Sequence, residues 1–277
     1  MEVNNAMYET LGHLWWSEDA GFELTSLRYC MNPVRYGYFQ RILRGFGSKG
    51  GTVLDIGCGG GYLAESFAAD GYQVTGLDPA VNSIAAARCH AAEAGLQIRY
   101  EVGCGESLPY EDGAFDIVCC CDVLEHVDDV GQVLREAART LKPGGMFFYD
   151  TVNRTFRSKL VLIKVWQDWN VGGFGELNGH VWEKFLKPSE LAAMLRAVGL
   201  RPGGIRGITA AKSPATLLHG LWKIRRSQLR GAAVASAFAM RETDDLGLSY
   251  IGWARKACNL MPASHEPCGK ADSQASM

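Results

Sequence analysis

The 277-residue sequence has no apolar run that approaches the roughly 18–20 residues of a transmembrane helix. It also has no basic N-terminal segment followed by an apolar stretch, which is the pattern of a secretion signal. With 28 Lys and Arg against 30 Asp and Glu, the net charge is only −2. No global field therefore draws the chain to nucleic acid or to anionic lipid. These absences predict a soluble cytoplasmic protein without a nucleic-acid partner.

The cysteines lack the pattern of a disulfide framework or of a zinc site. There are nine of them, with no Cys-x-x-Cys pair, and three are consecutive at Cys119–Cys121. This usage is typical of reduced thiols in a reducing compartment. The triplet is predicted to fill a buried strand.

A glycine-rich turn is the most informative feature that is present. Residues 54–61 read Leu-Asp-Ile-Gly-Cys-Gly-Gly-Gly, between a strand-like run at 52–54 and a helix predicted over Tyr62–Ala69. Glycines such as Gly57 and Gly59 make a tight turn without side chains. The backbone can therefore lie directly against a ligand.

The residues around this turn separate two cofactor classes. A second strand predicted over Tyr72–Leu77 ends at Asp78, and a carboxylate about 20 residues beyond such a turn is placed to accept both ribose hydroxyls of a nucleoside. A dinucleotide site needs a third glycine, but the sixth position counted from Gly57 is Tyr62. Asp55 would repel a pyrophosphate, whereas it suits the ammonium group of S-adenosylmethionine. We therefore expect a methyl donor in preference to a dinucleotide or to a purely structural turn.

Strand-like and helix-like segments alternate from about residue 50, which predicts an α/β fold with a doubly wound, mostly parallel sheet. Two short segments, 203–209 and 247–255, are expected to form an antiparallel pair at the sheet edge. The other predicted strands lie at 98–102, 115–121 and 146–151, with helices at 130–141 and 188–198.

The chain is predicted to divide into unequal parts. An N-terminal helical cap at 1–47 is rich in aromatic side chains and precedes a main domain at 48–258. That domain carries an insertion at 152–187, far longer than the ~2–6 residues usual for such a connection, and an extra helical segment at 215–240. The insertion is expected to act as a lid. Residues 259–277 are polar and aperiodic, which predicts a disordered tail.

Several polar residues stand at predicted strand ends. In an open parallel sheet, ligands bind beyond the carboxyl ends of the strands. Asp55, Gly57, Asp78, Glu106 and Asp122 occupy such positions and should converge on one cofactor site. For Glu106, a solvated loop carboxylate is an equally good interpretation.

A second constellation follows the strand at 115–121. Asp122, Glu125 and His126 fall at i, i+3 and i+4, so they share one face if the segment turns helically. Two carboxylates and an imidazole could hold a divalent cation, with magnesium or manganese preferred by hard oxygen ligands. Alternatively, His126 is a general base toward an acceptor hydroxyl. In a third interpretation, Glu125 and His126 only cap the next helix, and the sequence leaves all three open.

Four further segments narrow the assignment. They are Trp15-Trp16 with Gly21–Leu24, the stretch Met31–Tyr38 with its Asn-Pro-x-Arg element, Leu124–Val127, and Thr151–Arg154 followed by Lys184–Pro188. With these, the chain resembles class I S-adenosylmethionine-dependent methyltransferases, and within that class the O-methyltransferases of ubiquinone biosynthesis. The resemblance covers residues 8–200 and implies a Rossmann-like fold.

The resemblance also implies roles at the cofactor. Arg35 would lie over the cofactor carboxylate and, with Asp55, would orient the methionine moiety. Asp78 would bind the ribose. The backbone of Val123 would contact the cofactor as well.

Two further roles are implied for the acceptor side. Asp122, Glu125 and His126 match a magnesium-binding triad of some members, although the family commonly has Glu where this chain has Asp122. Glu125 and His126 are therefore the expected catalytic residues. The insertion at 152–187 matches a membrane-touching lid.

Together these observations predict an S-adenosylmethionine-dependent O-methyltransferase that acts on a hydroxyl of a small aromatic, lipophilic acceptor such as a polyprenyl phenol or quinol. The chain departs from the family after residue 205, so a different phenol or a thiol is an alternative acceptor. A non-catalytic cofactor-binding scaffold in a biosynthetic complex is the other alternative. The apolar insertion and the segment 217–230 are expected to cover the acceptor, touch a membrane periphery, join a second subunit in a homodimer, or fold back onto the core.

Overall fold

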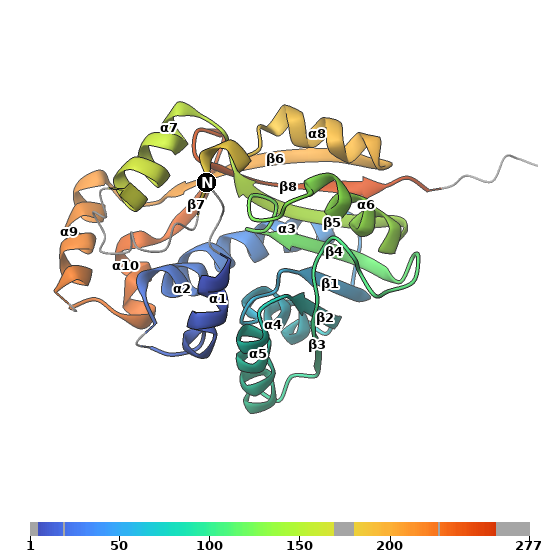
Figure 1. Ribbon diagram of the computed structural model, residues 1–277, viewed down its shortest axis with the longest axis horizontal. Coiled ribbons are helices and arrows are strands. Elements are labelled where there is room, and N and C mark those ends of the chain that lie inside the picture. The colour runs from blue at the N-terminus through green and yellow to red at the C-terminus, as the bar shows by residue number, and fades with distance from the viewer. Residues whose placement is uncertain (1–4, 19, 169–179, 227, 259–277) are drawn as a thin grey trace, which may run out of the picture.

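The structure is a computed structural model that describes residues 5–18, 20–168, 180–226 and 228–258. These residues form an eight-stranded sheet with the strand order β3-β2-β1-β4-β5-β8-β6-β7 (Figure 1). The strands are β1 (Thr52–Ile56), β2 (Gln73–Asp78), β3 (Ile98–Val102), β4 (Phe115–Cys121), β5 (Leu141–Val152), β6 (Leu200–Ala210), β7 (Met240–Thr243) and β8 (Ser249–Lys256). The pairs β3–β2, β2–β1, β1–β4 and β4–β5 are parallel. The pairs β5–β8, β8–β6 and β6–β7 are antiparallel. The predicted doubly wound, mostly parallel α/β sheet is confirmed.

Helices cover both faces of the sheet because each strand buries alternate side chains on opposite faces. Leu54 of β1 belongs to a core shared with α6 (Val130–Thr140) and α8 (Pro188–Ala197). Val53 belongs to a second core, shared with α3 (Asn32–Gly45), α4 (Tyr62–Ala69) and α5 (Val81–Glu93). The cysteine triplet alternates in the same way, with Cys120 in the first core and its two neighbours in the second. All three thiols are buried, so they fill strand β4 as predicted.

The antiparallel end of the sheet differs in detail from the prediction. Strands β6 and β8 do pair, but β8 also pairs with β5 and therefore lies inside the sheet. The outer edge is formed by β7, which pairs with β6 over Met240–Thr243. The sequence does not reveal β7 because Met-Arg-Glu-Thr lacks the apolar alternation of a strand. Strand β5 also begins earlier than predicted, at Leu141, because its first residue pairs with Phe115 before the register shifts.

The N-terminal segment is helical, as expected. It contains α1 (Ala6–Leu11), η1 (Gly12–Leu14), α2 (Phe22–Ser26) and η2 (Leu27–Met31) ahead of α3. Helix α3 buries Tyr38, Phe39 and Leu43 in the second core, so it is part of the sheet's own covering layer. Helix α1 and η1 pack on α5 instead, close to the carboxyl ends of the strands.

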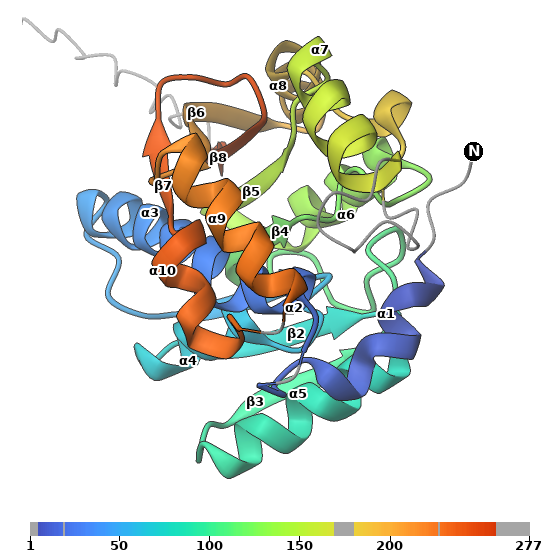
Figure 2. The same cartoon turned by 90° about the vertical axis from the view of Figure 1, so that its left-hand side faces the viewer.

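The two predicted additions to the core are also present as helices. The insertion begins with α7 (Phe156–Ser158) and η3 (Lys159–Asp168) and ends with η4 (Trp182–Lys184), whereas Trp169 and the rest of 169–179 lie outside the described residues. The segment 215–240 forms α9 (Pro214–Arg225), η5 (Gly231–Ala233) and α10 (Val234–Phe238). Its α10 packs with Cys30 and Phe22 of the N-terminal helices. Figure 2 shows α9 and α10 in front of α2. The tail predicted at 259–277 is likewise outside the described residues.

None of the helices in the described ranges is long and apolar enough to cross a bilayer.

Candidate active site

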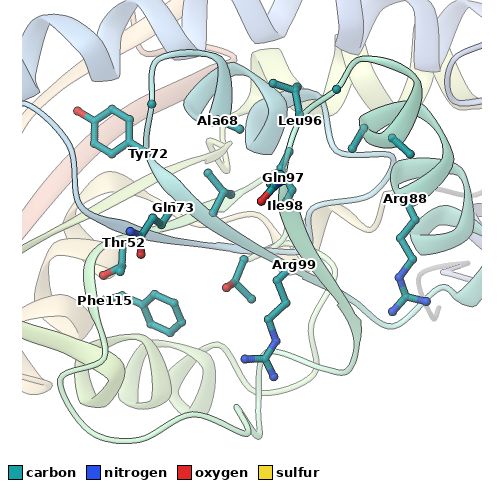
Figure 3. Close-up of a pocket in the computed structure, with 16 residues that line it drawn as sticks. Thr52, Ala68, Tyr72, Gln73, Arg88, Leu96, Gln97, Ile98, Arg99 and Phe115 are labelled. Carbon is teal, nitrogen blue, oxygen red and sulfur yellow. The ribbon is translucent and has the colours of Figure 1, made fainter.

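Two hollows lie at opposite ends of the parallel strands. The larger, about 890 Å³, is an open hollow at the amino ends of β1, β2 and β3, around Thr52, Gln73 and Ile98 (Figure 3). The arginines at its rim are engaged by the protein, since Arg88 bonds Tyr100 O and Arg99 bonds Glu101. The smaller, about 620 Å³, lies at the carboxyl ends of the strands, where ligands of such sheets bind. Its lining includes nine predicted site residues: Arg35, Asp55, Gly57, Gly59, Asp78, Glu106, Asp122, Val123 and His126.

The glycine-rich turn forms one wall of this pocket. Gly57 has a φ of 69°, a region that only glycine adopts without strain, and a Cβ there would collide with Val123 Cγ2. The N–H groups of Gly57 and Cys58 both donate to Leu77 O, at 2.7 and 3.1 Å. These bonds fix the turn against the end of β2. The turn lies on the pocket wall, and its contact with a ligand stays a prediction.

Asp78 connects the turn to the start of α5. Its carboxylate accepts from Gly59 N–H and from Ala80 N–H, each at 2.9 Å. The side chain is only 8% exposed, and burial raises its pKa against these two hydrogen bonds. Each oxygen keeps acceptor capacity, as a carboxylate offers about four acceptor positions. Asp78 is thus both a structural link and a carboxylate on the pocket wall.

Asp55 brings an unsatisfied carboxylate oxygen to the same end. The residue is 2% exposed, and its Oδ2 is buried without a hydrogen-bond partner. Burial raises its pKa to about 7, against the opposing charge of Arg35. Buried polar atoms are normally hydrogen-bonded. An orphaned acceptor on the pocket wall therefore suits the ammonium group of a bound donor.

Arg35 is held by two carboxylates. The guanidinium of this α3 residue forms ion pairs with Asp150, at the end of β5, and with Asp122. Asp122 has a φ of 53°, the one positive value of a non-glycine residue in the part of the chain that the structure describes. Burial, the largest single effect, raises the pKa of Asp122, but the charge and hydrogen bond of Arg35 together with a hydrogen bond involving Asp150 outweigh it and hold the pKa below its usual value. Arg35 therefore anchors helix α3 to the pocket, and Asp122 is committed to this pairing.

Glu125 and His126 follow in a turn rather than in a helix. His126 N–H donates to Val123 O at 2.8 Å, and α6 begins only at Val130. Glu125 Oε2 accepts from Thr151 Oγ1 at 2.8 Å, whereas Glu125 Oε1 and His126 Nδ1 are buried without partners. Burial raises the pKa of Glu125 to about 8, with Asp122 adding to the effect, and lowers the pKa of His126 to about 3.

The predicted face of three residues is therefore only partly assembled. Glu125 and His126 lie together, but their neighbour is His180, whose ring centroid is 5.4 Å from that of His126. The Asp122 side chain points to Arg35 instead. The physical reason is the turn conformation, since the one-face expectation required a helix at 122–126. No sequence pattern pointed to His180, which arrives at the site from the far end of the insertion.

The N-terminal segment covers part of the pocket. Asn5 Nδ2 donates to His126 O at 3.1 Å, and Ser83 Oγ of α5 donates to Tyr8 O at 3.1 Å. Helix α1 thus lies between the start of α5 and the turn that carries His126. Tyr8 lines the pocket, and Trp15 packs on the glycine-rich turn while its Nε1 donates to Ser83 Oγ at 2.9 Å. Sequence analysis missed these contacts, although the aromatic content of 1–47 was the available signal.

Comparisons with known proteins agree with this geometry. Residues 54–149 match a family described as a methyltransferase domain. The ubiquinone biosynthesis O-methyltransferase of Bordetella bronchiseptica is 38% identical over 220 residues, which cover 77% of this chain and 86% of that protein. The protein of the same name from Idiomarina loihiensis is 40% identical over 205 residues, which cover 73% of this chain and 81% of that protein.

Solved structures agree at the level of the fold. An SAM-dependent methyltransferase from Methanosarcina mazei has a TM-score of 0.54 and 20% identity, with 78% of this chain and 97% of that chain covered. At that identity the likeness supports the fold alone. The curated relatives go further, because their identity extends over most of both chains. The chain belongs to the ubiquinone biosynthesis O-methyltransferase family and is an S-adenosylmethionine-dependent methyltransferase.

Proposed function

We propose that the protein transfers a methyl group to a hydroxyl of a small aromatic, lipophilic acceptor of the quinol type. The observation that best supports this proposal is one pocket lined by two residues with unsatisfied polar atoms. Asp55 Oδ2 marks what we call the donor end, and His126 Nδ1 marks the acceptor end. The names of the curated relatives support the same acceptor class. Because these relatives are named as methyltransferases, the comparisons do not favour a non-catalytic scaffold.

The donor end orients the cofactor through residues that the pocket already presents. S-adenosylmethionine, when bound, supplies the methyl group on a positively charged sulfur. Asp55 receives its ammonium group, and Arg35 attracts its carboxylate. Asp78 receives the ribose hydroxyls. The remaining cofactor contacts are assigned to Gly57, Gly59, Glu106 and the backbone of Val123.

The acceptor end must hold a hydroxyl in line with the methyl group and remove its proton. Glu125 and His126 are the residues proposed for this role. His126 is neutral because burial disfavours its charged form. Its nitrogen without a partner can accept a hydrogen bond from the acceptor hydroxyl, whereas Glu125, whose pKa is raised to about 8, is the stronger base of the two.

The predicted magnesium triad does not suit the geometry. Magnesium prefers near-octahedral oxygen ligands. Asp122 is bound to Arg35, and one oxygen of Glu125 is bound to Thr151. Glu125 Oε1 is then the one carboxylate oxygen of the predicted triad that is buried without a partner. No step of the proposed chemistry is therefore assigned to magnesium at Asp122, Glu125 and His126.

Product analysis tests the proposed function. Wild-type protein is incubated with methyl-labelled donor and three acceptors: a catechol with an isoprenoid tail, the same catechol without it, and a matched aromatic thiol. We expect the methyl ether of the tailed catechol to form fastest. Label on the thiol alone would assign a different acceptor. Binding of S-adenosylhomocysteine without any methylated product would favour a scaffold.

We also infer a cytoplasmic protein that touches a membrane at its periphery. Four large apolar side chains of the insertion and of α9 are exposed, namely Phe156 at 80%, Leu160 at 41%, Leu218 at 64% and Trp222 at 45%. The opposite side of α9 is packed, since Leu217 and Leu221 lie against the core of α10. The expectation that this segment folds back onto the core therefore holds for one side of α9 only. The exposed side of α9 suits contact with a membrane interface.

Liposome co-sedimentation tests this surface. Phe156→Ser combined with Trp222→Ser should reduce binding to anionic vesicles, because each change removes exposed apolar area. Phe46→Ser is the matched control, since Phe46 is 47% exposed at the end of α3. If neither the wild type nor the variants bind vesicles at low salt, the membrane contact is wrong. These residues would then be buried in a homodimer contact, which sedimentation velocity would detect.

A further inference from the structure

Tyr8 of α1 lies on the pocket wall between the donor end and the acceptor end. Its ring packs on the indole of Trp15 at 6.3 Å between centroids, and it meets the ring of His126 edge-on at 6.0 Å. Trp15 packs on the glycine-rich turn, whereas His126 marks the acceptor end. Tyr8 therefore lies between the places proposed for the methyl donor and for the acceptor.

The backbone around Tyr8 is held by contacts with two other elements. Ser83 Oγ of α5 donates to Tyr8 O at 3.1 Å, and the same hydroxyl accepts from Trp15 Nε1 at 2.9 Å. At the start of α1, Asn5 Nδ2 donates to His126 O at 3.1 Å. The phenol of Tyr8 is thus presented by a segment that is already fixed, which lowers the entropy cost of binding a ligand there.

Two tyrosines of the described residues line the pocket, and the protein uses the hydroxyl of only one of them. Tyr62 donates its O–H to Trp15 O. The hydroxyl of Tyr8 has no hydrogen bond with any residue in the described part of the chain. Tyrosine hydroxyls away from bulk water usually find a hydrogen-bond partner, so the Tyr8 hydroxyl is available to a ligand.

The surroundings keep the Tyr8 hydroxyl protonated. Burial raises the pKa of Tyr8 well above its ordinary value. The negative charges of Asp122, Glu23 and Glu125 raise it further. Because an ionised carboxylate can only accept hydrogen bonds, a ligand near these groups meets several acceptors and, in Tyr8, a hydroxyl that can donate.

This distribution of donors and acceptors distinguishes the oxygens of a quinol-type ligand. The hydroxyl to be methylated must lose its proton, so it belongs beside Glu125 and His126, the residues proposed to remove it. An oxygen on the neighbouring ring carbon can then accept from Tyr8. An apolar group on that carbon would leave the Tyr8 hydroxyl without a partner, and a site built to hydrogen-bond an oxygen rejects the analogue that lacks it.

We propose that Tyr8 is a specificity-determining residue whose hydroxyl donates to the oxygen next to the methylated hydroxyl and so selects acceptors with two neighbouring oxygens. The class of acceptor rests on the proposed function. The hydrogen bond itself can be measured in the complex with S-adenosylhomocysteine, where no turnover takes place. The role of Tyr8 and the proposed function can therefore fail separately.

A pair of matched ligands tests the proposal. One is an ortho-methoxyphenol with an isoprenoid tail. The other is the ortho-ethylphenol with the same tail, in which a methylene group replaces the neighbouring oxygen. Calorimetry gives the affinity of each ligand for the S-adenosylhomocysteine complex of the wild type and of Tyr8→Phe.

We expect the wild type to bind the methoxy ligand about three- to tenfold more tightly than the ethyl ligand, which is the contribution of one neutral hydrogen bond. Tyr8→Phe should reduce this preference to within about twofold, because phenylalanine keeps the ring and lacks the donor. Tyr29→Phe is the matched control, since Tyr29 donates its hydroxyl to Glu18 and does not line the pocket. The control should keep the wild-type preference.

S-adenosylhomocysteine affinity and melting temperature, measured in parallel, report whether each variant keeps its donor end and its fold. Equal binding of the two ligands by the wild type, binding of neither, or an unchanged preference in Tyr8→Phe would each overturn the role of Tyr8. Loss of S-adenosylhomocysteine affinity in Tyr8→Phe would also overturn it, because the change would then act on the donor end. A wild type that shows the preference but transfers no label to the tailed catechol would support Tyr8 and reject the proposed function.

Discussion

The two ends of the pocket are built from different chemical groups. The donor end is mostly backbone, since Gly57 and Cys58 donate to Leu77 O and Asp78 accepts from two further N–H groups. All of these groups lie within one β-turn-α-β unit between β1 and the start of α5. The acceptor end is made of side chains that meet from distant segments, with Tyr8 and His126 on the pocket wall and with Glu125 and His180 beside His126. Apart from Arg35, Glu106 and Val123, the donor end therefore follows from local sequence, and the acceptor end follows from tertiary assembly.

This difference indicates where in the pocket substrate specificity can change. A backbone cradle tolerates little variation, because a Cβ on Gly57 or on Gly60 would collide with Val123 or with Trp15. The acceptor end can change one segment at a time without altering the sheet. If the comparison is correct, changes at one end should leave the other end working.

Removing the acceptor-end groups should abolish turnover and spare donor binding. Glu125→Gln combined with His126→Ala is expected to lower kcat by about 10²–10⁴-fold, the usual contribution of a positioned acid or base. The measurement is initial rate with labelled donor and the tailed catechol. His219→Ala, an exposed histidine on α9, should keep the wild-type rate. A double variant with wild-type kcat would remove Glu125 and His126 from the chemistry.

Removing the donor-end carboxylate should have the converse effect. Asp78→Ala is expected to weaken S-adenosylhomocysteine binding by about 10–100-fold, because hydrogen bonds to a charged group are lost. Gly59 N–H and Ala80 N–H donate to different oxygens of Asp78, so Asp78→Asn keeps an acceptor for one of them and should lose less affinity than Asp78→Ala. Calorimetry gives the affinities, and thermal melting checks the fold. Unchanged affinity in Asp78→Ala would show that the donor lies elsewhere.

Donor binding should depend on pH through Asp55. Its pKa is raised to about 7 by burial, so the neutral acid dominates below that pH in the unliganded protein. Because the carboxylate form holds the ammonium group, affinity should fall about tenfold per pH unit below about pH 7 and level off above it. Asp55→Asn should bind weakly at every pH and lose this slope. A wild-type affinity that does not change between about pH 5.5 and about pH 8 would contradict the role of Asp55.

The stability of the unliganded protein should change with pH in the opposite sense. A carboxyl whose folded pKa is raised contributes stability that is present below its unfolded pKa and is lost as the pH rises through the folded value. For Asp55 this window lies between its usual value and about 7. Wild-type protein should therefore lose more stability than Asp55→Asn over that window, as measured by denaturant unfolding.

Loosening the N-terminal helix should give the smallest effect. Asn5→Ala removes one hydrogen bond to His126 O, and such a bond contributes about 0.5–1.5 kcal/mol. Donor affinity should fall by no more than about tenfold, mainly through faster release measured by stopped flow. Thr10→Ala is the matched control, because Thr10 is exposed and bonds only within α1. Equal release rates in both variants would show that α1 does not cover the donor.

The limits of sequence analysis follow the same division. Strands β3 and β4 and helix α4 have the predicted bounds, because apolar alternation and glycine turns are local signals. Asp55, Asp78 and Val123 reach the pocket because strand ends in a parallel sheet converge. His180 could not be predicted, since its position depends on how the insertion returns to the sheet. Asp122 lines the pocket as expected, but its side chain pairs with Arg35 because its backbone has a φ of 53°, which the sequence does not reveal.

Donor binding and turnover should depend on different ends of the pocket. This separation is tested most directly by calorimetric titration of S-adenosylhomocysteine into the Glu125→Gln/His126→Ala double variant, whose turnover is expected to be lost. We expect an affinity within about twofold of wild type, because neither of the two changed side chains is assigned a contact with the cofactor. Loss of S-adenosylhomocysteine binding in a variant with an unchanged melting temperature would contradict it.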